Sequence, residues 1–263
     1  QKVASIIKFF QKEGRESFQK WLNRMSIYKP IILPILEDEG VPPELFYLAM
    51  IESGLNPKAY SYAHASGVWQ FISSTGKIYG LKKTWWVDER KDFEKSTRAA
   101  ARLLKNLYEA FDDWYLAFAA YNCGSTRVNK TIKRQGTRDY WKLTRLPPQT
   151  RNYVPNIMAA IFISNNPKKY GFALLKEEPM KWNVVDLDKA VSLDVISECS
   201  KLDIGILQSY NPELKQGTIP PLDKGEKYSF RLPVTASQDF DSLFNEVEIE
   251  KIQEIIFLEH KVK

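Results

Sequence analysis

The chain has 263 residues, which at ~150 residues per domain fits one large and one small domain. Hydrophobic residues make up 44% and charged residues 27%, a composition typical of globular proteins and unlike that of disordered chains. The 38 basic and 32 acidic side chains leave a net charge of +6, a surplus that favours anionic polymers without identifying one.

Several classes of chemistry are excluded by what the sequence lacks. No apolar run approaches the ~18 residues of a membrane span. Only two histidines and two cysteines are present, without the spacing of a zinc site. We therefore expect no metal and no cofactor, and we expect carboxylates to carry the chemistry.

The first 172 residues show helical periodicity. Apolar residues recur at i, i+3 and i+4 spacing first around Val3–Phe10 and then around Phe18–Met25. Another helix is expected to begin at Pro42-Pro43 and to end at Gly54, which suits a left-handed terminal residue. Further helical segments are predicted near 92–111, 114–121, 128–133 and 153–163. Strand signals are nearly absent, so residues 1–172 are predicted to form an all-α domain.

The pattern changes after residue 172. A strand is predicted near 182–185, two short helices at 193–202 and 204–209, and a closing strand at 228–232. This order predicts a small β-α-α-β domain over residues 173–235. Residues 236–263 are expected to form a partly helical linker, and its end resembles an unpaired strand. The predicted fold class is therefore mainly α, followed by this small mixed domain.

Glu52 is the acidic residue that the helical pattern singles out. It shares a helix face with Leu45 and Leu48, so its carboxyl group is expected to point toward apolar packing. Burial disfavours the ionised carboxylate and raises the pKa, which suits a general acid near neutral pH. Helical spacing alone nevertheless favours the simpler interpretation of a solvated glutamate at a helix end.

Aromatic residues are frequent in the stretch that follows Glu52. Between Tyr60 and Trp86 seven aromatic side chains alternate with neutral polar ones. Flat apolar faces beside neutral hydrogen-bonding groups suit a sugar polymer, although Phe71 and Tyr79 are expected to fill the core instead.

Four short blocks occur along the chain with compatible spacing. They are Ile51-Glu52-Ser53-Gly54, Gly67-Val68-Trp69-Gln70-Phe71, Ala119-Ala120-Tyr121-Asn122-Cys123-Gly124 and Tyr153-Val154-Pro155. Each block is weak alone, but in this order they resemble the signature of the family 1 lytic transglycosylases with an SLT domain, and most closely their membrane-bound D-type branch. The resemblance covers about residues 25–172 and implies a lysozyme-like helical fold. It also implies cleavage of the MurNAc–β-1,4–GlcNAc bond of peptidoglycan glycan strands.

The resemblance also implies roles for individual residues. Glu52 would be the sole catalytic acid/base, and the Tyr121 hydroxyl would be able to bond its carboxyl group. The substrate-binding residues would be Ser61, near an acetamido group, Gln70 in the cleft, Tyr121 and Asn122 on its floor, and Tyr153 on the opposite wall. Cys123 and Trp69 depart from the commoner residues of the family, and neither change alters these expectations.

A single carboxylate implies a non-hydrolytic mechanism. The substrate's N-acetyl oxygen would stabilise the reaction centre, and the product would be a 1,6-anhydro sugar of the lyase type. Two alternatives stay open, a goose-type lysozyme-like hydrolase of peptidoglycan and a non-catalytic wall-binding protein. The combination of Glu52 with Gln70, Tyr121 and Asn122 argues against the second. Nucleic acid is not expected as a partner, because no clustered Lys/Arg stripe accompanies the net charge.

The small domain resembles a degenerate LysM module. Its Asn211-Pro212 follows the second helix as in that family, but Asp186-Leu187-Asp188 stands where a Gly-Asp-Thr turn is expected. Glycan binding and a purely structural role are therefore both open, and His260–Lys263 resembles the start of another such module. The substrate implies a location in the periplasm. The resemblance is compatible with a lipid anchor to the outer membrane, and we expect a monomer.

Overall fold

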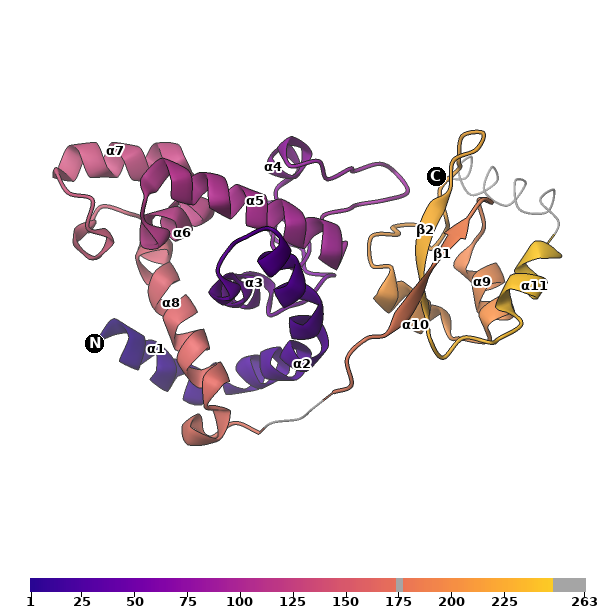
Figure 1. Cartoon of the computed structure of the whole chain (residues 1–263). Helices are drawn as coiled ribbons and strands as arrows, with labels where there is room; N and C mark the ends of the chain where they lie inside the picture. Colours follow the sequence, from indigo (N-terminus) through magenta and orange to yellow (C-terminus); the bar gives the residue numbers. More distant parts are fainter. Residues whose placement is uncertain (174–176, 248–263) are drawn as a thin grey trace. The chain divides into compact units, whose positions relative to one another are not determined.

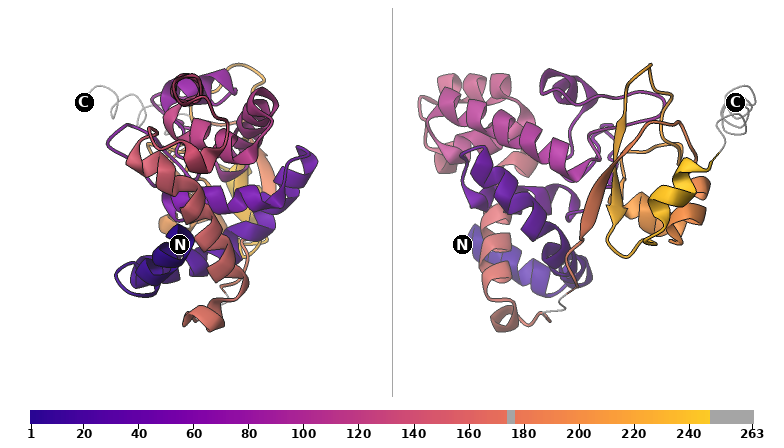
Figure 2. Two further views of the ribbon diagram at one scale, coloured as in Figure 1. Left: turned by 90° about the vertical axis from the view of Figure 1, so that its left-hand side faces the viewer. Right: turned by 45° about the vertical axis from the view of Figure 1, so that its right-hand side comes forward.

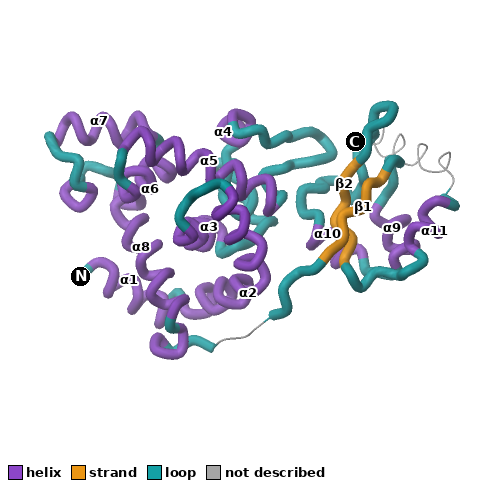
Figure 3. Tube along the Cα trace, in the orientation of Figure 1, coloured by secondary structure: helices purple, strands orange, loops and turns teal. Residues whose placement is uncertain are grey.

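The computed structural model describes residues 1–173 and 177–247, which form two compact units (Figure 1). The first unit comprises residues 1–81 and 93–179, and the second comprises 82–92 together with the chain from residue 180 onward. Within the described residues the first unit is helical and the second contains a small sheet (Figure 3). The predicted fold class is confirmed, mainly α with a small β-α-α-β part.

The first unit is formed by α-helices that pack against one another. Its described α-helices are α1 (Lys2–Gln11), α2 (Arg15–Asp38), α3 (Phe46–Ser53), α4 (Ser73–Ile78), α5 (Phe93–Phe111), α6 (Trp114–Cys123), α7 (Ser125–Gln135) and α8 (Pro148–Asn165). Short 3-10 turns occur at Pro43–Leu45, Tyr140–Lys142 and Pro167–Tyr170. α3 packs against α2 and α8, while α6 packs against α5, α7 and α8 (Figure 2). Helix α8 therefore contacts both α3 and α6.

The end of α3 is fixed by a close backbone approach. Gly54 adopts φ +61° and donates its amide to the carbonyl of Met50, as the sequence predicts for a left-handed cap. A Cβ at this position would lie 2.2 Å from Nε1 of Trp21, so glycine is required for space as well as for conformation. The Gly54 carbonyl accepts a hydrogen bond of 3.0 Å from Arg24. The last turn of α3, which carries Glu52, is thus held against α2.

The second unit is built on a two-stranded antiparallel sheet. Strand β1 (Trp182–Leu187) pairs with β2 (Tyr228–Pro233) in a register that joins Trp182 to Pro233 and Leu187 to Tyr228. The helices of this unit in the described residues are α9 (Leu193–Ser200), α10 (Ile204–Tyr210) and α11 (Phe240–Asn245). Ile196, Leu207 and Phe230 are completely buried between helices and sheet. The chain order β-α-α-β is the predicted one.

The expected domain boundaries differ from these units. Residues 82–92, which we expected in the helical domain, pack with the second unit, because the amide of Asp88 donates to the carbonyl of Glu213 at 2.9 Å. The first unit also extends beyond residue 172 to residue 179. Neither correction follows from periodicity, because both depend on contacts between segments far apart in the chain.

The segment expected to be a partly helical linker, 236–263, is described as far as residue 247. Residues 240–245 form α11, which packs against α9 and buries Phe240 and Phe244 in the core of the second unit. These two aromatic rings stack on each other with centroids 5.5 Å apart. The strand expected at 260–263 lies outside the described residues.

Candidate active site

Glu52 lies in the last turn of α3, which packs against α8, and its charge acts on Tyr121 of α6 and Tyr153 of α8. Burial raises the pKa of its carboxyl group to about 7, and a hydrogen bond from Tyr153 opposes part of that rise. This rise agrees with the interpretation that places the carboxyl group against apolar packing and not with the solvated glutamate that helical spacing alone favours. A carboxyl group with this pKa can be protonated or ionised near neutral pH, as a residue that both gives and takes a proton requires.

Tyr153 is the direct partner of Glu52. It lies on α8 and is only 3% exposed, and its hydroxyl group donates a short hydrogen bond to Oε1 of Glu52. Burial raises the pKa of Tyr153 well above its usual value, and the negative charge of Glu52 adds to the rise. Tyr153 is thus a neutral donor across the working pH range. The family resemblance implied that Tyr153 binds substrate from the opposite wall, and it did not predict this hydrogen bond to Glu52.

Tyr121 has a different partner from the one we expected. Its hydroxyl group donates to the backbone carbonyl of Trp69 at 2.7 Å and not to the carboxyl group of Glu52. The Trp69 side chain is buried and donates to Thr97, so the backbone beside it also lies in the interior. A buried carbonyl outside regular structure needs a donor, and Tyr121 supplies it. Burial and the nearby charge of Glu52 both raise the pKa of Tyr121.

Gln70 and Ser61 support the loop that faces the end of α3. The side-chain nitrogen (Nε2) of Gln70 donates to the carbonyls of Gly67 at 2.9 Å and Ala59 at 3.3 Å. The backbone of Gln70 adopts φ +51°. The hydroxyl oxygen of Ser61 accepts from the amide of Ala65 at 3.1 Å. The side-chain oxygen of Gln70 and the hydroxyl hydrogen of Ser61 are the groups that these bonds leave for a ligand.

Aromatic side chains in the same region have three different environments. Tyr62, beside Ser61, is fully exposed, and Phe71 is buried as predicted. Tyr79 is half-buried and accepts a hydrogen bond from Asn106. Trp85 and Trp86 belong to the second unit, so the run of seven aromatics does not form one surface of the helical unit.

Asn122 is linked to a residue that the sequence analysis missed. Its side-chain oxygen accepts a hydrogen bond of 2.8 Å from the hydroxyl of Thr150, which leaves the amide NH2 for a ligand. Thr150 lies in the first turn of α8, three residues before Tyr153 and on the same helix face. That spacing was the available signal for its place in the site.

The described residues offer no metal-binding cluster. Within 1–173 and 177–247, no three His, Cys, Asp or Glu side chains gather as a metal ion would require. The helices found in the same ranges are all too short or too polar to cross a membrane.

Two family models match the chain. Residues 30–144 match the Transglycosylase SLT domain, and residues 182–249 match the LysM-like domain of lytic transglycosylase MltD. The matched part of the helical unit, which contains Glu52, is thus similar to an SLT domain.

The chain is also similar to membrane-bound lytic murein transglycosylase D. It is 35% identical to that protein from Escherichia coli strain K12, and equally to that from strain CFT073, over 221 residues. The alignment covers 78% of this chain and 49% of the relative, so the chain spans about half the length of these proteins. An inactive mutant of lytic transglycosylase Slt from Pseudomonas aeruginosa is 22% identical, with a TM-score of 0.44 over 55% of this chain and 25% of that chain.

Proposed function

We propose that the helical unit is a peptidoglycan lytic transglycosylase that cleaves the MurNAc–β-1,4–GlcNAc bond without water. The observation that carries the proposal is the Glu52 carboxyl group, which has a pKa of about 7 and a single buried hydroxyl donor, Tyr153. The family match and the similarity to murein transglycosylases support the choice of substrate.

In the first step Glu52 acts as an acid. Its protonated carboxyl group gives the proton to the glycosidic oxygen, the bond between that oxygen and C1 of MurNAc breaks, and the GlcNAc leaves with a free 4-hydroxyl group. Burial is what keeps the proton on Glu52 at neutral pH, because it destabilises the ionised form. Tyr153 then stabilises the carboxylate that the step produces.

Stabilisation of the positive centre at C1 is assigned to the substrate. Most glycosidases use a second carboxylate for this purpose or to activate water. Within the described part of the chain, the pKa of Glu52 is set by burial and by Tyr153, without a contribution from another carboxylate. We therefore assign the role to the N-acetyl oxygen of MurNAc, which would form an oxazolinium intermediate.

In the second step Glu52 acts as a base. Its carboxylate takes the proton from the C6 hydroxyl of the same MurNAc and the C6 oxygen bonds to C1. The bond between C1 and the N-acetyl oxygen breaks, which restores the acetamido group. The product is 1,6-anhydroMurNAc, Glu52 is protonated again, and no water is consumed. Ser61, Gln70 and Asn122 would bind the sugar through the polar groups that their internal hydrogen bonds leave available.

The substrate implies where the protein acts. Peptidoglycan lies outside the cytoplasmic membrane, so we propose a periplasmic protein, attached to the outer membrane by a lipid anchor. The LysM-like unit would hold the glycan or support the fold. We propose that the chain acts as a monomer.

The products of digested sacculi test the proposal. We expect anhydro muropeptides, which are lighter by one water than the reducing-end products of a goose-type hydrolase, in a mass spectrum. The Glu52→Gln variant should fold normally and bind glycan without releasing product. Products with reducing ends, or an active Glu52→Gln variant, would overturn the mechanism.

A further inference from the structure

The positive charge of the chain is concentrated in one segment. Eight of the 38 Lys and Arg residues, but only one of the 32 Asp and Glu residues, lie between Trp114 and Arg151. The segment has a net charge of +7, and the rest of the chain, at −1, is close to neutral. The single acid, Asp139, is already paired with Lys142 at 3.4 Å and caps the turn at Trp141. The expectation that basic residues are not clustered is therefore wrong.

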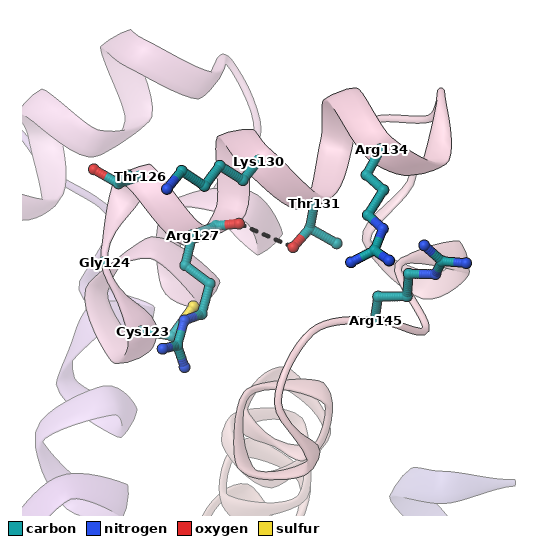
Figure 4. A pocket seen from close by; sticks show the side chains of 8 residues that line it. All are labelled: Cys123, Gly124, Thr126, Arg127, Lys130, Thr131, Arg134 and Arg145. Atoms are coloured by element: carbon teal, nitrogen blue, oxygen red, sulfur yellow. Dashed lines mark hydrogen bonds between the residues drawn. The ribbon is translucent and has the colours of Figure 1, made fainter.

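Four of these cations line one cavity. Arg127, Lys130 and Arg134 lie on one face of α7, and Arg145 approaches from the loop that follows residues 140–142 (Figure 4). The cavity has a volume of about 400 Å³. Its other lining residues are Cys123, Gly124, Thr126 and Thr131. Among the described residues no carboxylate lines this cavity, which we call the α7 pocket.

Helix stability does not account for this arrangement. Arg134 lies in the last turn of α7, where a cation is favoured by the helix dipole, but Arg127 lies in the first turn, where it is disfavoured. Among the described residues, no ion pair is found for any of the four cations of the pocket. Cations that converge without a counter-charge repel one another, and a bound anion relieves that repulsion.

The wall that carries Arg145 is fixed to α7. The backbone amide of Arg145 donates to the side-chain oxygen of Gln135 at 3.0 Å. The side-chain nitrogen of Gln135 donates to the hydroxyl oxygen of Thr144 at 3.2 Å. The same nitrogen also donates to the carbonyl of Lys142. Because Gln135 is the last residue of α7, the pocket is formed before any ligand arrives.

The α7 pocket adjoins the candidate active site. Its inner edge is Cys123, the residue after Asn122, and the Cys123 thiol is hydrogen-bonded with Thr150. The same Thr150 donates its hydroxyl hydrogen to the side chain of Asn122. The floor of the sugar site and the edge of the cationic pocket thus share one side chain, so a substrate in the first has the second beside it.

We propose that the α7 pocket binds the carboxylates of the peptidoglycan stem peptide. This inference rests on the proposed function, because the stem peptide is attached to the MurNAc whose bond would be cleaved. Stem peptides carry several free carboxylates on a short chain, and the guanidinium groups of Arg134 and Arg145 match carboxylates in geometry and charge. A cavity of about 400 Å³ suits a short peptide better than it suits a nucleic acid, which covers an extended surface.

A binding experiment tests the pocket without turnover. The probe is the free stem tetrapeptide L-Ala-γ-D-Glu-diaminopimelate-D-Ala, titrated calorimetrically into the whole chain at low and moderate salt. We expect binding that weakens with salt and weakens about tenfold in the Arg134→Gln/Arg145→Gln variant, since each exposed pair contributes up to ~1 kcal/mol. The matched control is Lys133→Gln/Lys168→Gln, which removes the same charge from exposed lysines outside the pocket. A fully amidated tetrapeptide should not bind.

A kinetic experiment tests the role of the pocket in the reaction. Turnover is compared on peptide-bearing glycan strands and on strands whose peptides have been removed by an amidase. For the pocket variant we expect KM to rise about tenfold on peptide-bearing strands, with kcat unchanged and no effect on peptide-free strands. The control variant should match the wild type on both.

The outcomes separate this inference from the proposed function. In one outcome sacculi are not degraded, but the tetrapeptide binds to the wild type and binds weakly to the pocket variant. The proposed function then fails and the peptide site stands. If sacculi are degraded and the pocket variant behaves like the control with both probes, the site fails and the function stands. Binding of a single-stranded oligonucleotide that needs Arg134 and Arg145, without binding of the tetrapeptide, would also overturn the proposal.

Discussion

The hydroxyl group of Tyr153 donates a hydrogen bond to the carboxyl group of Glu52 across 101 positions of sequence. The second tyrosine of the site, Tyr121, donates instead to the backbone of Trp69. One tyrosine therefore adjusts the acid itself, while the other supports the loop in front of it. This difference gives the two hydroxyl groups separate and measurable effects.

The Tyr153→Phe substitution should shift the pH dependence of activity. The hydrogen bond from Tyr153 lowers the pKa of Glu52, so its removal should raise that pKa above about 7. The alkaline limb of the kcat/KM profile should move to higher pH, and kcat should fall by about tenfold because the carboxylate formed in the first step loses its donor. Profiles from pH 5 to 9 on sacculi provide the measurement.

Tyr121→Phe is the matched control for that substitution. It should leave the alkaline limb in place and should lower stability by about 1–3 kcal/mol, because the buried carbonyl of Trp69 loses its donor. An alkaline shift in the Tyr121 variant and none in the Tyr153 variant would contradict this assignment.

Glu52→Gln should stabilise the protein in a pH-dependent way. The pKa of Glu52 is about 7 in the folded protein against 4.5 for the ordinary group, so the folded state holds the proton more tightly. Wild-type stability should then fall as pH rises from 4.5 through 7, by about 3 kcal/mol in total. Glutamine does not titrate, so the variant should match the wild type at pH 4 and exceed it at pH 8. Urea unfolding at both pH values tests this, and equal stabilities at pH 8 would refute it.

Arg231→Met should strongly destabilise the second unit. The buried guanidinium group pairs with Asp92 at 2.8 Å and with Glu213 at 3.3 Å, and Tyr228 donates to Glu213 at 2.9 Å. Burial and the charge of Asp92 raise the pKa of Glu213 to about 7 even with the arginine present. Without it two buried carboxylates lose the guanidinium group that pairs with both of them, at a cost of about 3–5 kcal/mol.

Thermal unfolding of the Arg231 variant gives the measurement, with Arg98→Met as the control. Arg98 pairs with Asp38 and Glu39 at 3.3 and 3.5 Å, but its side chain is 45% exposed, so its loss should cost less than ~1 kcal/mol. Similar losses in the two variants would show that burial of the Arg231 cluster does not matter.

Gly54→Ala should be more harmful than the same change at another helix end. At Gly54 the new Cβ meets Trp21 and the residue must keep φ +61°, so we expect a loss of about 2–4 kcal/mol. Gly136 ends α7 with φ +66° and nothing within 4 Å, so Gly136→Ala should cost only about 1 kcal/mol. The denaturant midpoints of the two variants measure this difference in stability. Equal midpoints would show that Trp21 moves aside.

The sequence by itself determined much of this protein. Apolar periodicity predicted the helical unit and the β-α-α-β order, and a glycine at position 54 predicted the left-handed end of α3. The place of Glu52 on the apolar helix face indicated a raised pKa, although helical spacing alone favoured a solvated glutamate. All of these are local properties of the chain.

Only the tertiary structure decided which groups meet. The partners of Tyr121 and Tyr153 depend on how α6 and α8 are rotated against α3, and periodicity does not encode that rotation. The transfer of residues 82–92 to the second unit depends on pairing with a segment more than a hundred residues away. The α7 pocket required Arg145 to be brought beside α7 by Gln135, because a cavity is formed by packing between segments.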